Sequence, residues 1–279
     1  MTVQRIAAFS DGPVGGNPAG VMIATSLPDA ASMQAIAREV GFSETAFAAP
    51  AGDAWRVRYF SPASEVPFCG HATIALGAAL ALRHGDGLYR LQLNDAAITV
   101  EGRRDGDLVV AALQSPSTRS APADPTLVAA ALRLFALEPA DLDPRLPPAA
   151  IHAGADHLVL ALADRGRLAG MAYDLEAGRA LMHAAGLVTI ALVHAQGAQH
   201  FAARNAFASG GVLEDPATGA AAAAFAGYLR DLGWPHGGAI EIIQGEDMGM
   251  RSRIHATIPE APGSSIRVSG TARWMARPR

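Results

Sequence analysis

Three titratable side chains lie in sequence settings that suit chemistry on a small molecule. The chain's one cysteine, Cys69, stands two residues before His71 in EVPFCGHATIALGAAL (65–80), where an alanine-rich helical run begins. Glu44 lies in GFSETAF (41–47). The apolar neighbours there would remove its carboxylate from water, as a general base or acid working near neutral pH requires. A surface or capping role for Glu44 and a buried structural role for Cys69 remain open alternatives.

The setting of Cys69 and His71 occurs a second time in the chain. EDPATGAAAAAFAGYL (214–229) aligns with residues 65–80 without a gap, at an offset of 149 residues (214 minus 65). Both stretches share the pattern E-x-P-x-x-G-x-A followed by a helical run. So long a period indicates two similar domains rather than a solenoid. Chance matching of alanine-rich runs is the alternative.

The repeated element can bind an anion. Gly70 and Gly219 each stand at the start of a helical run, where backbone N–H groups lack helical partners and carry partial positive charge. Two such helix ends facing each other across a domain cleft would bind a carboxylate. Asp215 lies in the loop before the second run. Alternatively, Thr73 and Thr218 are plain helix caps and the glycines only shape turns.

The remaining sequence predicts short strands around a few helices. Apolar spacing predicts helices over 31–40 and 126–137, and Gly41 is a suitable C-terminal cap for the first. Short apolar or alternating segments predict strands, at 5–9, 20–24, 55–60, 88–93, 98–101, 108–113, 158–162, 188–193, 240–244 and 265–275. The Pro- and Ser-rich residues 114–125 are interpreted as a linker or the start of a domain crossing. This pattern is α+β and not doubly wound.

Composition and motif spacing exclude several function classes. The net charge is −4 and only 6% of residues are aromatic, which disfavours nucleic acid as a partner. No apolar stretch is long enough to span a bilayer, and the N-terminus has no apolar signal core. A single cysteine favours a cytoplasmic protein. The histidines lack metal-site spacing, and no dinucleotide or NTPase loop occurs. We therefore expect neither metal nor cofactor.

Taken together, the motifs resemble those of the PhzF-like family, named for an isomerase of phenazine biosynthesis. The matching segments run in order along the chain: GGNPAGV (15–21), FSETAF (42–47), YFSPASEVPFCGHAT (59–73), 204–207, EDPATGAAAAAF (214–225) and QGEDMG (244–249). The resemblance implies the diaminopimelate epimerase fold, in which two pseudo-symmetric α+β domains each wrap a β-barrel-like sheet around a central helix. We expect the domains at 1–115, joined by 265–279, and at 116–264.

The resemblance also implies a chemistry and a site. The phenazine isomerase moves a proton from C3 to C1 of trans-2,3-dihydro-3-hydroxyanthranilate without a cofactor or metal. The catalytic residues implied are Glu44, which moves the proton, with His71 and Asp215, which hold polar groups or relay protons. The implied substrate-binding residues are Asn17, Gly70, Gly219 and Ala220. A cytoplasmic homodimer that binds a small carboxylate is expected.

Two departures from the family pattern leave the substrate open. Ala220 replaces the serine that usually follows EDPATG, and Gly249–Ser252 replaces the usual GRPS. Loss of a site hydroxyl could weaken binding by roughly 0.5–1.5 kcal/mol. A non-catalytic carboxylate-binding protein of the same fold is therefore an alternative, and a Cys69-dependent enzyme is another. A two-thiol racemase is excluded because Ala217 and Thr218 occupy the region that would need a second cysteine.

Overall fold

The computed structural model describes residues 2–106 and 108–275. The chain divides into two compact units: unit 1 is Met1–Gln114 with Ser269–Arg279, and unit 2 is Ser115–Val268. Both boundaries fall inside strands, one in β8 (Leu108–Ser117) and one in β17 (Ser265–Trp274). The chain therefore passes from one unit to the other within a strand both times.

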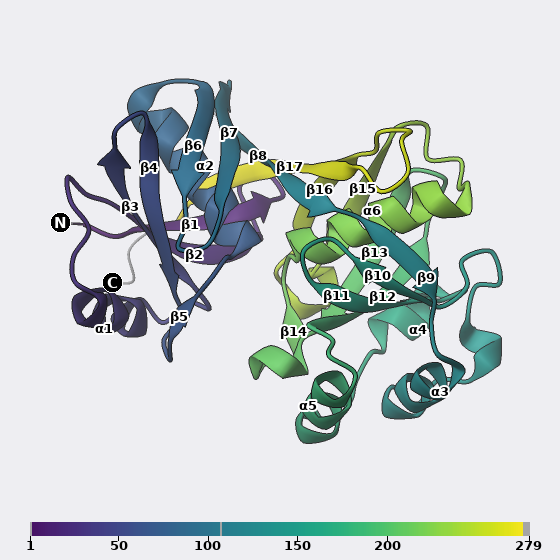
Figure 1. Ribbon diagram of the computed structural model, residues 1–279. Helices are drawn as coiled ribbons and strands as arrows, with labels where there is room; N and C mark the ends of the chain where they lie inside the picture. Colours follow the sequence, from purple (N-terminus) through teal and green to yellow (C-terminus); the bar gives the residue numbers. More distant parts are fainter. Residues whose placement is uncertain (1, 107, 276–279) are drawn as a thin grey trace. The chain divides into compact units, whose positions relative to one another are not determined.

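Unit 1 is built from short strands and two helices that follow one another along the chain (Figure 1). In order these are β1 (Gln4–Ser10), β2 (Asn17–Ile23), α1 (Ala30–Val40), β3 (Thr45–Ala51), β4 (Ala54–Phe60), β5 (Glu65–Val66), α2 (Gly70–His84), β6 (Gly87–Gln92) and β7 (Ala97–Asp105), followed by β8 and the end of β17. The sheet order is β17-β1-β2-β3-β4-β6-β7-β8, with β5 against β4. Because β17 also pairs with β8, this sheet is barrel-like.

Unit 2 repeats this arrangement with added helices. Its elements are β9 (Arg119–Pro122), α3 (Pro125–Leu134), β10 (Ala149–His152), β11 (Asp156–Ala161), α4 (Arg165–Ala169), α5 (Leu175–Ala184), β12 (Thr189–Ala195), β13 (His200–Ala206), β14 (Glu214–Asp215), α6 (Gly219–Leu232), β15 (Ala239–Gln244) and β16 (Ser252–Thr257), with short 3₁₀ turns at Pro139–Asp141, Ala208–Gly210 and Glu246–Met248. The sheet order is β9-β10-β11-β12-β13-β15-β16, with β14 against β13.

Strand directions confirm the internal duplication. In unit 1 the pairs β2–β3 and β4–β6 are parallel and the neighbouring pairs are antiparallel. In unit 2 the pairs β11–β12 and β13–β15 are parallel at the corresponding places. The helix that crosses over between the second parallel pair is α2 in unit 1 and α6 in unit 2. These are the two alanine-rich runs of the sequence repeat.

The central helices are buried because their apolar side chains face every direction. All residues from His71 to Ala81 of α2 are buried, as are those from Ala221 to Arg230 of α6. α2 packs against β1, β2 and β7, and α6 packs against β9, β10 and β16 (Figure 1). A helix that is apolar all round belongs inside a core, and small side chains let strands approach it closely.

Two glycines set the distance between α2 and β7. A Cβ added at Gly102 would lie 2.3 Å from the carbonyl oxygen of Gly77, and one at Gly77 would lie 2.5 Å from Val100 Cγ2. Contacts so short do not occur in real structures, so both positions need a hydrogen in place of a side chain. The helix and the strand therefore touch almost backbone to backbone.

Most expected elements are confirmed, and two details differ. α1 (Ala30–Val40) follows its N-cap Asp29, and its C-cap is Gly41, with φ 73°, as the sequence predicted for Gly41. The expected helix over 126–137 ends three residues early, at Leu134. Residues 114–125 are not an irregular linker, because they include the end of β8 and all of β9. The alternative interpretation, the start of a domain crossing, is confirmed, because the units divide between Gln114 and Ser115. Pro122 is compatible with β9 because it is the last residue of that strand, where a missing N–H interrupts little.

Among residues 2–106 and 108–275, no helix combines the length and the apolar character that a membrane span needs.

The core of unit 2 forms around apolar side chains from α3, α5 and the central strands, including Leu158, Leu160, Met182 and Leu192. In unit 1 the smaller cluster of Met22, Met33, Ala37, Phe47 and Phe60 holds α1 against the sheet. These clusters pack α1, α3 and α5 against the strands of their own unit.

Candidate active site

The first turn of α2 is anchored by buried hydroxyl groups. Cys69 is the N-cap residue, in extended conformation, and its side chain does not cap the helix. The hydroxyl of Thr73 donates to the carbonyl of Cys69 at 2.7 Å and lies 2.7 Å from the hydroxyl of Tyr59. Thr73 is therefore not an N-terminal cap, and its contacts fix the backbone at the residue that carries the thiol.

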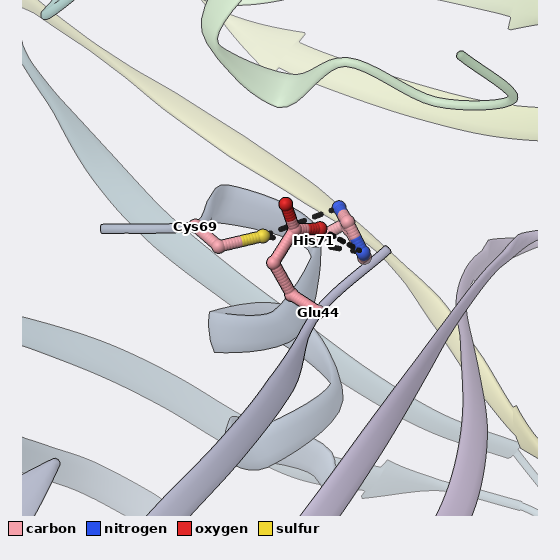
Figure 2. Close-up of side chains that lie close together, drawn as sticks. All are labelled: Glu44, Cys69 and His71. Atoms are coloured by element: carbon pink, nitrogen blue, oxygen red, sulfur yellow. Dashed lines mark hydrogen bonds and ion pairs between the residues drawn. The ribbon is translucent and has the colours of Figure 1, made fainter. Parts of the chain in front are cut away.

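His71 contacts both the thiol and the carboxylate that the sequence singles out (Figure 2). Its Nδ1 is 3.4 Å from the sulfur of Cys69, and its Nε2 is 3.5 Å from Oε2 of Glu44. The hydroxyl of Ser43 lies 3.4 Å from the same Nε2. A thiol, an imidazole and a carboxylate therefore meet at one end of α2.

The position of Glu44 follows from a tight strand contact. Its carbonyl accepts a hydrogen bond from the N–H of Gly20 at 3.1 Å, immediately before β3 begins. A Cβ on Gly20 would lie 2.5 Å from Oγ1 of Thr45, so glycine is required for β2 and β3 to come this close. The side chain of Glu44 is 18% exposed and that of His71 is 7% exposed. Both groups are largely shielded from water, yet the carboxylate is still reachable by a ligand.

This geometry can hold or transfer a proton. Imidazole can accept at one ring nitrogen and donate at the other, so His71 can connect the carboxylate with the thiol. A carboxylate near an imidazole and shielded from water is a typical acid–base arrangement. The sequence predicted Glu44 and His71 as partners, and the structure brings them together.

In unit 2, Asp215 belongs to a separate polar network around the start of α6. Its carboxylate accepts a hydrogen bond from the hydroxyl of Thr218 at 2.6 Å. The side-chain amide of Gln244 donates to the carbonyl of Asp215 at 2.7 Å and accepts from the N–H of Thr218 at 3.2 Å. Thr218 is the N-cap residue of α6, but its hydroxyl binds Asp215 and does not cap the helix. Gln244 thus orders the loop that carries Asp215.

Gln244 was not among the predicted site residues. It is 1% exposed and sits at the end of β15, 29 residues after Asp215. The available signal was its position at the head of QGEDMG (244–249), one of the segments that carry the family resemblance.

The glutamate of each E-x-P-x-x-G motif forms an ion pair with an arginine of the neighbouring strand. In unit 1, Arg58 on β4 donates to Glu65 at 2.7 and 2.5 Å. In unit 2, Arg204 on β13 lies 2.5 Å from Glu214. The hydrogen bond from Arg58 lowers the pKa of Glu65 below its usual value. Each pair fastens the short strand that leads into a central helix, so these glutamates position the motif.

The four predicted binding residues lie at element starts. Asn17 is the first residue of β2 and is buried, while Gly70 and Gly219 are the first residues of α2 and α6. Ala220 follows in the first turn of α6 and is half-buried. A Cβ on Gly70 would meet only Phe68, at 4.0 Å, so there is room for a ligand beside that backbone.

Comparison with known proteins identifies the family. The sequence model of the phenazine biosynthesis-like protein family matches residues 6–277. The chain belongs to this family. It is 33% identical, over 284 aligned residues, to the trans-2,3-dihydro-3-hydroxyanthranilate isomerase of Pseudomonas aeruginosa, with 98% of this chain and 97% of that protein covered. A protein of the same name from Pseudomonas chlororaphis is 32% identical and covers 90% of this chain and 88% of its own.

Solved structures show the same fold. A phenazine biosynthesis protein of the PhzF family from Bacillus anthracis superposes with a TM-score of 0.84 at 23% identity, covering 98% of this chain and 96% of that one. A probable proline racemase from Agrobacterium radiobacter superposes with a TM-score of 0.61 at 11% identity, covering 98% and 90%. The chain thus has the α+β epimerase-like fold that the sequence predicted, and its enzyme class within the family is isomerase.

Proposed function

We propose that this family member moves a proton between two positions of a small cyclic or conjugated carboxylate, using Glu44 as general acid and base. The observation that carries the proposal is the contact between Oε2 of Glu44 and Nε2 of His71. In the proposed reaction the carboxylate of Glu44 removes a proton from one carbon of the ligand and returns it to another, so no other reactant is consumed. His71 stabilises the negative charge of Glu44 before the transfer, or relays the proton.

The two helix ends supply ligand contacts in this proposal. Backbone N–H groups at the starts of α2 and α6 would bind the carboxylate or the enolate charge that develops during transfer. Asp215, held in place by Thr218 and Gln244, would bind an amino or hydroxyl group of a ligand. The relatives named trans-2,3-dihydro-3-hydroxyanthranilate isomerase make that compound the first substrate to try.

Exchange of ligand hydrogen for deuterium in D2O tests this proposal. Wild-type protein should incorporate deuterium into the product at the carbon that receives the proton, detected by proton NMR. Glu44→Gln should lower the rate about 10²–10⁴-fold, because a positioned general base contributes about that much. Glu39→Gln, an exposed change on α1, is the matched control and should exchange like the wild type. Exchange that persists unchanged in Glu44→Gln would defeat the proposal.

A second candidate is a reaction that depends on Cys69. The observation that favours it is the 3.4 Å contact between its sulfur and Nδ1 of His71, since a neighbouring imidazole can activate a thiol. Cys69→Ser separates the candidates. Activity that survives this change supports Glu44 chemistry, whereas activity lost in Cys69→Ser and kept in Glu44→Gln supports the thiol. A folded protein that binds the carboxylate but gives neither turnover nor exchange would indicate a binding protein instead.

A further inference from the structure

Glu44, Cys69 and His71 together offer three metal-binding atoms of different chemical type. A carboxylate oxygen, a thiol sulfur and an imidazole nitrogen from these residues all lie within 4.8 Å of one another. All three residues belong to unit 1, so the arrangement depends on that unit alone. Figure 2 shows the three side chains converging beside the first turn of α2.

The spacing of these atoms is close to that around tetrahedral zinc. Zinc bonds of about 2.0–2.3 Å to nitrogen, oxygen and sulfur place neighbouring ligand atoms about 3.3–3.8 Å apart. Nε2 of His71 is 3.5 Å from Oε2 of Glu44 and 3.9 Å from the sulfur of Cys69. The third edge, from the sulfur of Cys69 to a carboxylate oxygen of Glu44, is at most 4.8 Å. Rotation of these side chains, by up to about an ångström at this edge, would therefore complete three corners of a tetrahedron.

The types of ligand select the metal. Sulfur and imidazole nitrogen favour zinc and similar soft cations, whereas magnesium and calcium prefer sites made of oxygen alone. Three protein ligands leave a fourth position open, which distinguishes this arrangement from closed structural zinc sites. The side chain of His71 is 7% exposed and that of Glu44 is 18% exposed, so the cluster is sheltered but not sealed.

We propose that Zn²⁺ binds to Glu44, Cys69 and His71 and thereby blocks the acid–base group of the enzyme. Binding replaces the proton of the Cys69 thiol, which passes to solvent, and it engages the carboxylate that would otherwise move the substrate proton. Zinc is thus an inhibitor of this enzyme and not its cofactor. The inhibition rests on the proposed function, while zinc binding itself does not.

Cobalt substitution is the direct test of binding. The full-length, tag-free and reduced protein, first treated with a chelator, is titrated with Co²⁺. A thiolate-to-cobalt charge-transfer band should appear in the near ultraviolet and disappear when Zn²⁺ is added. Cys69→Ser should lose this band. Glu44→Gln should bind cobalt at least about tenfold more weakly, since even outer-shell changes cost that much. Glu39→Gln is the matched control and should titrate like the wild type.

A folded wild-type protein without the charge-transfer band would overturn the inference, as would a Cys69→Ser variant that titrates unchanged. Circular dichroism establishes the fold of each variant. Should Cys69→Ser fail to fold, alkylation of the wild type decides: zinc should slow the reaction of Cys69 with iodoacetamide, and an unchanged rate refutes zinc binding. If zinc binds but deuterium exchange is unaffected, the proposed inhibition is wrong and the proposed zinc site still stands. Absence of exchange without zinc counts against the proposed function and leaves metal binding intact.

Discussion

The guanidinium of Arg204 lies 2.5 Å from the carboxylate of Glu214, and their side chains are only 11% and 5% exposed. The arginine also donates to the carbonyls of Ala169 and Met171. The corresponding pair in unit 1, Arg58 and Glu65, is 23% and 26% exposed. The same motif therefore contains one buried and one half-buried ion pair.

Glu214→Gln should destabilise the protein by about 3–5 kcal/mol, because it leaves the buried Arg204 charge without its partner. Glu65→Gln should cost less, since water can partly replace the lost carboxylate. Urea unfolding measures both. Asp53→Asn is the control, because Asp53 pairs with Arg90 on the surface and such pairs are worth about 0.2–1 kcal/mol. If Glu214→Gln and Asp53→Asn lower the free energy of unfolding equally, burial of the Arg204–Glu214 pair does not add to its contribution to stability.

Buried His157 should make stability depend on pH in the mildly acidic range. Its imidazole is fully buried, Nδ1 lies 2.7 Å from the hydroxyl of Thr189, and burial lowers the pKa of His157 from 6.5 to about 4. The unfolded chain takes up a proton below pH 6.5, whereas the folded protein resists it until about pH 4. His157 therefore costs no stability above pH 6.5, and the free energy of unfolding falls by about 3 kcal/mol on acidification to pH 4.

His157→Gln tests this dependence. The variant should show a flatter decline of urea midpoint with falling pH than the wild type, whatever its absolute stability. His200→Gln, an exposed change on β13, is the matched control and should keep the wild-type slope. Identical slopes in all three proteins would rule out His157 as the source.

Gln244→Leu should weaken substrate binding more than it slows turnover. The change removes the hydrogen bonds that hold the carbonyl of Asp215 and the N–H of Thr218, which together are worth about 1–2 kcal/mol, or roughly tenfold in affinity. Steady-state kinetics with the substrate found by exchange should show a raised KM and a nearly unchanged kcat. The exposed Gln196→Leu is the control. A loss confined to kcat would instead place Gln244 in the proton transfer.

Gly102→Ala should destabilise the protein by at least about 1–3 kcal/mol, because its new methyl group would meet the carbonyl of Gly77 and force β7 away from α2. Thermal unfolding followed by circular dichroism measures the loss. Gly87→Ala on β6 is the control: its Cβ would meet only Tyr89, at 4.0 Å, and the change should stay within about 0.5 kcal/mol. A Gly102→Ala variant as stable as the control would contradict the close approach.

The duplicated fold could be predicted because its signal lies in short motifs. Gly70 and Gly219 begin helices as predicted, and the Glu, Pro and Gly of both motifs recur in register. Glu44 and His71 could be paired because the family resemblance fixed both positions. Residues 114–125 do contain the start of the domain crossing, between Gln114 and Ser115. The alternative of a linker was wrong because proline and serine are also common in loops, and only the partner strand β10 shows that β9 forms.

The arginines of the two ion pairs could not be found from the repeat. Arg58 precedes Glu65 by 7 residues, whereas Arg204 precedes Glu214 by 10, so an ungapped offset misaligns them. They correspond only through the strand pairing, in which Glu65 faces Phe60 and Glu214 faces Ala206. The loops between the paired strands differ in length in the two units. Spacing along the sequence therefore does not show that the two arginines correspond.

The two central helices begin alike in backbone but not in side chains: Cys69 and His71 on α2 correspond to Thr218 and Ala220 on α6. The tip of α2 thus carries a thiol and an imidazole, whereas the corresponding positions at the tip of α6 carry a hydroxyl and a methyl group. Under the proposed function, replacements at 220 would alter which ligand is accepted and leave Glu44, His71 and the Thr218–Asp215 hydrogen bond in place. A directed-evolution campaign aimed at new specificities would begin on α6 and leave α2 alone.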